Sequence, residues 1–348
     1  MDTLTHALSG ALLARATAPT ASRIDQLSLR SRLLVGFLAG AFPDSDVVIR
    51  LFGDVITYLN LHRGITHSLP LLPLWALLLA AAFALLWRGR HSWRAFYGVT
   101  LLALCIHVGG DVITTYGTKI FAPFSDYRAT LPAIFIIDLV FTGIIIAGLL
   151  SAWLWRSSLP ARLGLVVLVG YVGMQTCQMT EARAVGVRYA AAQGVQAVAI
   201  SALPQPLSPL HWKIIMQDAQ GYHVADAHLH RHEALPEPAA DSAFFRRLAA
   251  LYRPLDDLHW RYHPQFGSGP GQAALGHAAW QDAALAQLRR FTEYPALYAI
   301  DEQGSGVCVW FHDLRFELRN LRNPFIFGGC RESSDGVWRL ERLLDSAA

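Results

Sequence analysis

The sequence predicts an α-helical membrane domain followed by a smaller α+β polar domain. Hydrophobic residues make up 53% of the chain and charged residues only 16%, and the mean hydropathy is +0.31. A soluble domain carries about 25% charged residues. The apolar residues are concentrated before about residue 182, whereas Asp, Glu, His and Pro become frequent after it. We therefore expect a membrane domain over residues 1–182 and a polar domain over residues 183–348.

Four apolar stretches are close to the ~20 residues that a membrane-crossing helix needs. They cover residues 69–87, 93–116, 131–155 and 161–180. Two shorter apolar segments, residues 4–14 and 33–42, precede them and suit buried or partly inserted helices. The membrane domain is thus expected to have about four full spans plus two short N-terminal helices. A cleaved signal peptide is not expected, because no charged n-region precedes Leu4.

The arginines predict how the domain is oriented. Nine fall in three alternate connections, namely Arg15, Arg23, Arg30, Arg32, Arg88, Arg90, Arg94, Arg156 and Arg162. The other connections hold only Arg50, Arg63, Lys119 and Arg128. By the positive-inside rule the first set faces the cytoplasm. If both short helices cross or nearly cross the membrane, the N-terminus and the polar domain lie outside.

The sequence of the polar domain predicts an α+β fold. It contains no recognisable catalytic motif. Strands are expected at 211–218, 296–300 and 306–311, and helices at 241–252 and 278–291. Cys308 and Cys330 lie in this domain, where an extracytoplasmic location would permit a disulfide. Cys105 and Cys177 lie in apolar spans and are expected to be buried.

Polar residues gather at the predicted outer face of the membrane domain. They occur in MDTLTH at the start, FPDSD at 42–46, HRGITHS at 62–68, and His107 with Asp111 in a predicted span. Ionisable residues inside a span are costly, so a functional site is the default hypothesis. The candidate metal ligands are Asp2, His6, Asp44, Asp46, His62, His67, His107 and Asp111, a set that suits Zn, Mn or Fe. Asp138, within the 131–155 stretch, either completes the site or pairs with Arg128.

Each cluster by itself also has a structural interpretation. A single His near a helix end is usually a structural residue, and Asp-Ser-Asp after Pro43 can cap a helix. The convergence of four clusters on one face favours a divalent metal site with one or two ions. His107 and Asp111, at i and i+4, share one helix face.

The motifs MDTLTHALSGALL, FPDSD, HRGITHS and HVGGDVITTYG resemble those of the YdjM-like family of inner-membrane proteins over about residues 1 to 180. The resemblance implies a metal-dependent hydrolase in a bacterial inner membrane. A more distant similarity, in ligand order, is to zinc-dependent phospholipase C. That similarity implies the Met1 amine or Asp2 as an N-terminal ligand. Between Asp111 and His211 the chain has no His, so a third metal ion is not expected.

The two resemblances, together with a site at the membrane face where lipid head groups lie, imply hydrolysis of a phosphoester or related bond in a lipid or lipid-linked substrate. A bound metal ion activates water, and Asp44 or Asp46 could bridge two ions or accept the proton. Arg63 could neutralise phosphate, or it could anchor the chain at the membrane interface. The alternative is a non-enzymatic membrane protein, with a structural metal site or as a metal transporter. A net charge of +3 is too small to indicate nucleic-acid binding. The sequence does not define the oligomeric state.

Overall fold

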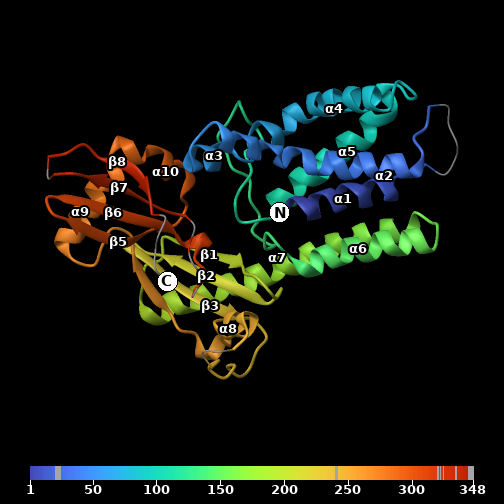
Figure 1. Ribbon diagram of the computed structural model, residues 1–348. Coiled ribbons are helices and arrows are strands. Elements are labelled where there is room, and N and C mark those ends of the chain that lie inside the picture. The colour runs from blue at the N-terminus through green and yellow to red at the C-terminus, as the bar shows by residue number, and fades with distance from the viewer. Residues whose placement is uncertain are drawn as a thin grey trace. The chain divides into compact units, whose positions relative to one another are not determined.

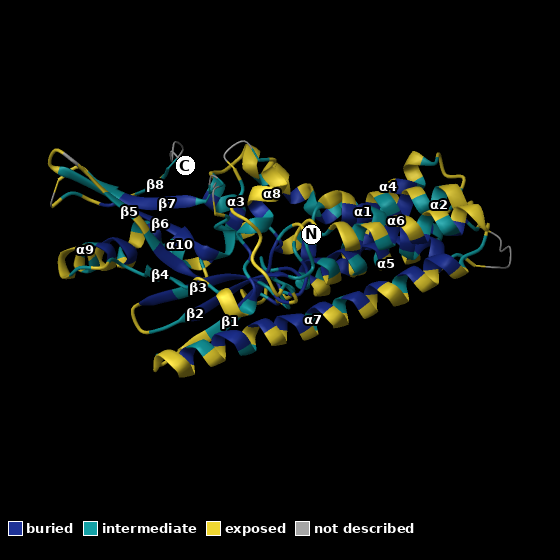
Figure 2. Ribbon diagram, turned by 90° about the horizontal axis from the view of Figure 1, so that it is seen from below, coloured by how far each residue is buried: buried dark blue, intermediate teal, exposed yellow. Residues whose placement is uncertain are grey.

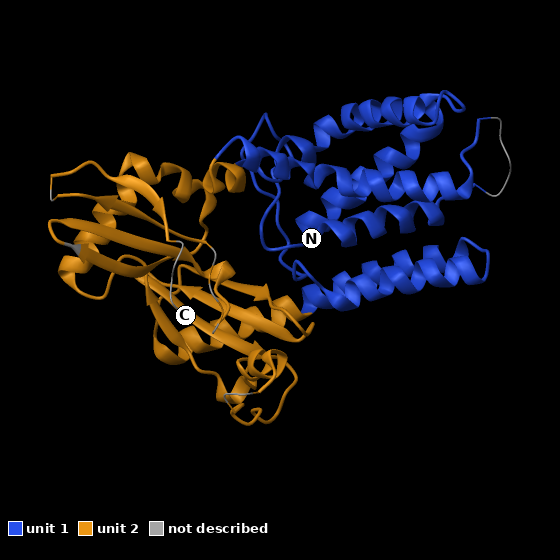
Figure 3. Cartoon of the chain, in the orientation of Figure 1, with its two compact units in different colours: residues 1–53, 61–177 blue, residues 54–60, 178–348 orange. Residues whose placement is uncertain are grey.

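The structure is a computed structural model that describes residues 1–19, 25–239, 242–319, 321, 323, 325–333 and 335–343. The chain divides into two compact units, shown in Figure 3. The first comprises residues 1–53 and 61–177, and the second comprises residues 54–60 and 178–348. The short helix α3 (Val55–Leu61) thus belongs mainly to the second unit, where Asn60 donates a hydrogen bond to the Gln287 carbonyl (2.9 Å).

The first unit is helical (Figure 1). Its helices are α1 (Thr3–Ala16), α2 (Leu29–Ala41), the 3-10 helices η1 (Phe42–Leu51), η2 (Ile65–His67) and η3 (Leu69–Leu71), then α4 (Leu72–Leu86), α5 (Trp93–Val112), α6 (Leu139–Leu154) and the first part of α7 (Leu159–Gln193). Among the described residues, three helical segments are long and apolar enough to cross a membrane. They are Leu69–Leu86, Trp93–Val112 and Leu159–Gln193.

The expected span over residues 131–155 is shorter in the structure. Helix α6 begins only at Leu139, because the Asp138 carboxylate caps it by accepting a hydrogen bond from the Phe141 amide (2.8 Å). Asp138 also accepts a hydrogen bond from the Tyr171 hydroxyl (2.9 Å). The prediction that Asp138 lies inside a span was therefore wrong. Helix α5 ends at Val112, before Tyr116, and α7 continues beyond the expected end at residue 180 into the second unit.

Helices α1 and α2 are packed unusually closely. A Cβ atom on Gly10 would clash with the Gly36 carbonyl oxygen, and one on Gly36 would lie 2.6 Å from the Gly10 carbonyl oxygen. Gly40, four residues after Gly36, has the same restriction against the His6 carbonyl (2.7 Å). Small residues at this spacing let helix backbones approach in a membrane. The close approach brings His6 beside the end of α2.

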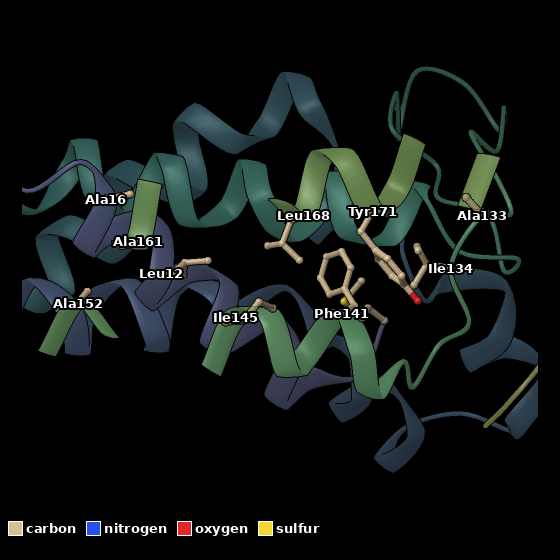
Figure 4. Packing of buried hydrophobic residues seen from close by; sticks show 11 residues of the cluster. Leu12, Ala16, Ala133, Ile134, Phe141, Ile145, Ala152, Ala161, Leu168 and Tyr171 are labelled. Carbon is tan, nitrogen blue, oxygen red and sulfur yellow. The ribbon is translucent and has the colours of Figure 1, made fainter. Parts of the chain in front are cut away.

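One hydrophobic cluster in the first unit joins α1, α6 and α7. Leu12 lies among Phe141, Ile145 and Leu168, and Figure 4 shows these side chains directed into the space between the helices. Figure 2 shows exposed residues along α6 and α7, and many of them are apolar, including Leu150, Trp153 and Val166. A helix that is apolar all round is typical of a membrane span.

Cys105 on α5 and Cys177 on α7 are exposed, although we expected them to be buried. Hydropathy does not distinguish the lipid-facing side of an apolar helix from its packed side.

Arginines satisfy carbonyl groups at one end of this helical unit. Arg15 Nη2 donates to the Ala152 carbonyl (3.2 Å), Arg32 Nε to the Ala14 carbonyl (2.9 Å) and Arg162 Nε to the Ala16 carbonyl (2.9 Å). Cations near helix C-termini also interact favourably with the helix dipole. Arg23, another member of the predicted cytoplasmic set, lies outside the described residues.

The described residues of the second unit form two four-stranded antiparallel sheets, which confirms the α+β prediction. One has the order β1 (Ala199–Pro204), β2 (His211–Gln217), β3 (Gly221–His228), β4 (Arg261–Pro264). The other has the order β5 (Pro295–Gln303), β6 (Gly306–Asp313), β7 (Ile326–Arg331), β8 (Arg339–Arg342). The end of α7 packs on the first sheet, where a Cβ on Gly186 would meet Ile200 (2.7 Å) and Ile214 (3.1 Å).

The helices of the second unit are shorter than expected. Helix α8 (Phe244–Ala250) replaces the expected 241–252 helix, of which Asp241 lies outside the described residues. The expected 278–291 helix is interrupted at Asp282, which ends α9 (Pro270–Gln281) and caps the short turn before α10 (Ala286–Phe291). Cys308 and Cys330 face each other across β6 and β7 and form a disulfide.

Candidate metal centre

Four segments of the first unit deliver imidazole and carboxylate groups to one place. Helix α1 carries His6, η1 carries Asp44 and Asp46, the turn at η2 carries His67, and the last turns of α5 carry His107 and Asp111. Pro43 at the start of η1 favours the 3-10 turn that projects the two aspartates. His107 and Asp111 are fully buried on one face of α5.

Four of these side chains form a group suited to one metal ion. His6, Asp44, His107 and Asp111 each offer one ligand atom, and these atoms all lie within 4.8 Å of one another. The Asp44 side chain, at 12% exposure, is the most accessible of the four. Nearby imidazoles, including that of His67, keep the pKa of the Asp44 carboxyl below its usual range although burial opposes this. Asp44 is therefore ionised, as a metal ligand requires.

His67 adjoins this group through its Nε2 atom. That atom lies 3.0 Å from His107 Nε2, 3.1 Å from Asp111 Oδ2 and 3.8 Å from Asp44 Oδ1. The opposite nitrogen of His107, Nδ1, donates a hydrogen bond to the Gly40 carbonyl (2.6 Å). A backbone carbonyl at this position fixes the tautomer of a metal-binding histidine and directs the Nε2 lone pair toward the ion.

Asp111 supplies the strongest indication that a cation belongs here. Its Oδ1 atom contacts His6 Nε2 (3.0 Å), Arg63 Nη2 (2.8 Å) and the Met1 amine (2.5 Å). Its Oδ2 atom is buried and lies 3.1 Å from His67 Nε2 and 3.4 Å from His107 Nε2, but it forms no well-aligned hydrogen bond with a described residue. A metal ion bound between this oxygen and the two imidazoles would satisfy all three groups. The residues present therefore fit a divalent metal.

Asp46 and His62 form a second pair beside the group. His62 Nδ1 lies 2.8 Å and 3.0 Å from the two Asp46 oxygens, and the Arg63 amide donates to Asp46 Oδ2 (3.1 Å). Because a carboxylate accepts hydrogen bonds, Nδ1 of a neutral His62 donates and the imidazole lone pair lies on Nε2. Asp46 Oδ2 also lies 3.8 Å from His67 Nδ1. Asp46 is thus placed to orient both imidazoles.

Arg63 is directed into the protein rather than toward a ligand surface. Its side chain is 2% exposed, and besides Asp111 it donates to the Thr114 hydroxyl through Nη1 (2.8 Å). Its guanidinium carbon lies 5.0 Å from the centre of the Tyr116 ring. The expected contact with a substrate phosphate is therefore replaced by compensation of the buried Asp111 charge.

Asp2 is also placed differently from the expected metal ligand. Its two oxygens accept hydrogen bonds from the Thr5 amide (3.0 Å) and the Thr5 hydroxyl (2.6 Å), so that Asp2 caps α1. This cap sets the start of the helix that carries His6. The Thr3 hydroxyl supports the site directly by donating to Asp44 Oδ2 (2.7 Å).

Comparison with known proteins places this helical unit in a family. The model of the YdjM inner membrane protein family matches residues 1–182, which include every candidate ligand described above. The chain belongs to the YdjM inner membrane protein family. One relative is the uncharacterized protein YfhP of Bacillus subtilis (strain 168), 34% identical over 160 residues. That match covers 42% of this chain and 47% of YfhP, so the chain spans about half the length of this relative. No solved structure matches.

Some features of this candidate site are not visible in the sequence. The hydrogen bond from His107 to the Gly40 carbonyl and the inward direction of Arg63 both depend on how the helices pack. Their only local signals in the sequence are GxxxG at 36–40 and the residue order HR at 62–63. In the second unit, His263, His312 and Glu317 also come together. No sequence motif or spacing connects these three residues.

Proposed function

We propose that this YdjM-family protein is a membrane-bound metal-dependent hydrolase, acting on a phosphoester or related bond in a lipid or lipid-linked substrate. The observation that carries the proposal is the buried cluster of His6, Asp44, His107 and Asp111, with ligand atoms within 4.8 Å of one another. Such a cluster in an apolar helical unit is costly unless it serves a function.

His6, Asp44, His107 and Asp111 would hold the metal, with His67 as a further ligand. Imidazole and carboxylate ligands suit zinc, with manganese or iron as alternatives. Five candidate ligands support one or two ions. When bound, such an ion lowers the pKa of a coordinated water toward neutrality and polarises a phosphoryl or carbonyl oxygen.

The residues around the ligands have distinct tasks in this proposal. The Asp46 and His62 pair accepts a proton at His62 Nε2, since the Asp46 carboxylate holds Nδ1–H and stabilises the imidazolium that forms. The His62 side chain is 17% exposed, whereas Asp46 is 4% exposed, so proton exchange with solvent or substrate runs through His62. Arg63 maintains the ionised state and position of Asp111. These are positioning and proton-transfer roles, not direct phosphate contacts.

Exposed apolar residues next to the carboxylates support a lipid substrate. In η1, directly after Asp44 and Asp46, Leu51 is 77% exposed, and Val47 and Val48 are also exposed. Phe52, the residue that ends η1, is exposed as well. A group of exposed large apolar residues beside a polar site is typical of a surface that contacts lipid. Acyl or isoprenoid chains would lie against it while the head group reaches the metal centre.

Two features support a location of the second unit outside the cytoplasm of a bacterial cell. Arginines bind carbonyl groups at the end of the helical unit formed by the C-termini of α1 and α6, and this end would face the cytoplasm. The Cys308–Cys330 disulfide suits an oxidising compartment. In this arrangement α1, α2 and α6 cross or nearly cross the bilayer together with the three longer helices.

The experiment that tests this function combines metal analysis with a substrate screen on detergent-purified protein. Phosphomonoester, phosphodiester, amide and acyl-ester lipids are offered to the metal-loaded protein. We expect release of phosphate or a phosphorylated head group, abolished by chelator and by His107→Ala. His91→Ala is the matched control, because His91 pairs with Asp25 away from the candidate ligands. Metal binding without any hydrolysis would instead support a structural metal site.

A further inference from the structure

We propose that the second unit binds a divalent ion of the zinc class through His263, His312 and Glu317. His263 lies in β4, His312 lies near the end of β6, and Glu317 follows the 3-10 turn η6 (Leu314–Phe316). Each offers one ligand atom, and the three atoms lie within 4.8 Å of one another. The strands that carry the two histidines, both labelled in Figure 2, belong to different sheets of this unit.

Two of the three side chains have buried polar atoms that need a partner. His263 Nε2 and Glu317 Oε2 are inaccessible to solvent and form no hydrogen bond with any described residue. Leaving such atoms unsatisfied costs roughly 1–3 kcal/mol each, and more for a charged carboxylate. A metal ion coordinated by both atoms would remove this cost. Buried polar networks that serve only structure usually satisfy their members internally.

The ligand types suit a divalent ion, since two imidazole nitrogens and one carboxylate oxygen converge from three separate segments of this unit.

Lys213 fixes the position of the segment that carries Glu317. This fully buried lysine, on β2, donates hydrogen bonds through Nζ to the backbone carbonyls of Leu314 (3.0 Å) and Glu317. It thereby fixes the chain on both sides of the 3-10 turn.

Two other cations near the site are already compensated. Arg261 pairs with Asp226 at 3.0 Å, and Arg315 pairs with Asp313 at 2.7 Å. Besides these two ion pairs, the charged side chains beside the imidazoles are Lys213 and Glu317, which have opposite signs. The charges around the site therefore balance, and they do not repel a divalent ion.

Two imidazoles and one carboxylate make a three-ligand set. This set is typical of zinc sites that keep a further position for water or a small anion, and of non-haem iron sites. The site is separate from the candidate centre in the first unit and does not depend on the proposed hydrolase function. Metal analysis of the purified protein distinguishes zinc from iron, because it identifies the ion that the protein retains.

The test measures metal stoichiometry in the full-length protein, equilibrated in detergent with zinc and then freed of excess ion. Glu317→Gln and His263→Gln should each lose one zinc equivalent relative to the parent chain, with at least a ~10-fold weaker affinity for that equivalent. The same loss is expected in the His107→Ala background, in which the first centre is impaired. His259→Ala is the control, because this histidine of the same unit is 61% exposed and should retain all zinc.

Cobalt substitution supplies a second readout. We expect a visible cobalt absorption band from imidazole and carboxylate ligation that is absent in Glu317→Gln and present in His259→Ala. If Glu317→Gln does not fold, His263→Gln decides, because His263 is only half-buried. Unchanged zinc stoichiometry and an unchanged cobalt band in a folded variant of either ligand would overturn the proposal.

Discussion

The Nε2 atoms of His67 and His107 lie 3.0 Å apart in the interior of the helical unit. His107 donates its Nδ1 hydrogen to the Gly40 carbonyl, so its Nε2 carries a lone pair when the ring is neutral. His67 Nε2 also lies 3.1 Å from Asp111 Oδ2, so without a metal ion a hydrogen on this atom would join the two rings and the carboxylate. A bound cation would take the place of that hydrogen and contact the same three groups.

Loss of His107 should therefore reduce metal binding. His107→Ala is expected to lower bound metal at least ~10-fold while the protein still inserts into the membrane. Metal content of purified protein, measured beside that of His91→Ala, checks this. His107 would be excluded as a ligand if folded His107→Ala kept its full complement of metal. Glu317→Gln, which should lose the metal of the second unit, shows that the assay detects the loss of one ion.

Arg63 should stabilise the protein more strongly without metal than with it. Arg63→Ala removes a partner 2.8 Å from the buried Asp111 carboxylate, and breaking a buried ion pair typically costs about 3–5 kcal/mol. A bound divalent ion supplies alternative positive charge. We expect a large drop in thermal stability in chelator and a smaller drop in zinc. Equal destabilisation in both conditions would show that metal and Arg63 do not share Asp111.

The contact between α1 and α2 should not tolerate a side chain at its centre. Gly10→Ala places a methyl group against the Gly36 carbonyl, so the helices must separate, at a cost of about 1–3 kcal/mol or more. Gly98→Ala on α5 is the control, since nothing lies within 4 Å of the added Cβ. Thermal unfolding in detergent should show a lower midpoint for Gly10→Ala only. Because His6 is on α1, metal affinity should fall with it.

Reporter fusions should place the two ends of the helical unit on opposite sides of the membrane. We expect a fusion at Gln205 to report a location outside the cytoplasm and a fusion at Gly89 to report the cytoplasm. The arginine distribution and the Cys308–Cys330 disulfide are the reasons. Cytoplasmic signals from both positions would mean that the short helices do not cross.

The second unit should lose stability on acidification through His211. Burial lowers the pKa of this histidine from 6.5 to about 4, and its ring stacks on Tyr252 with centroids 3.9 Å apart. The unfolded chain therefore binds the proton more readily than the folded chain. The stability that neutral His211 contributes to the folded unit is complete above pH 6.5 and is lost as the pH falls through 4. At about 1.4 kcal/mol per pKa unit, the shift from 6.5 to about 4 corresponds to a total loss of at most roughly 3.5 kcal/mol.

The full-length His211→Phe variant isolates this effect, since Phe keeps the ring stack but cannot bind a proton. Denaturant unfolding of the second unit, followed by near-UV circular dichroism between pH 7 and pH 4, should be less pH-dependent in the variant. The same pH dependence in both proteins would assign the acid sensitivity to other groups.

The sequence by itself determined the membrane class, the order of the domains and the residue types of the candidate centre. Hydropathy, composition and arginine position carry that information because the bilayer imposes the same requirement on every segment. His107 and Asp111 could be placed together because four residues along a helix return to the same face. The disulfide could be anticipated only as permitted, since pairing of Cys308 with Cys330 requires the register of β6 and β7.

Tertiary structure decided which of those residues meet. Asp2 and Asp138 had the right chemistry for the site, but each caps a helix, because a local amide lies within reach of its carboxylate. Arg63 turned inward because the buried Asp111 needs a compensating charge. The grouping of His263 with Glu317 depends on two sheets and a 3-10 turn, which no sequence period encodes. Sequence patterns report contacts along one element, whereas a site assembled from several elements follows from how their faces pack.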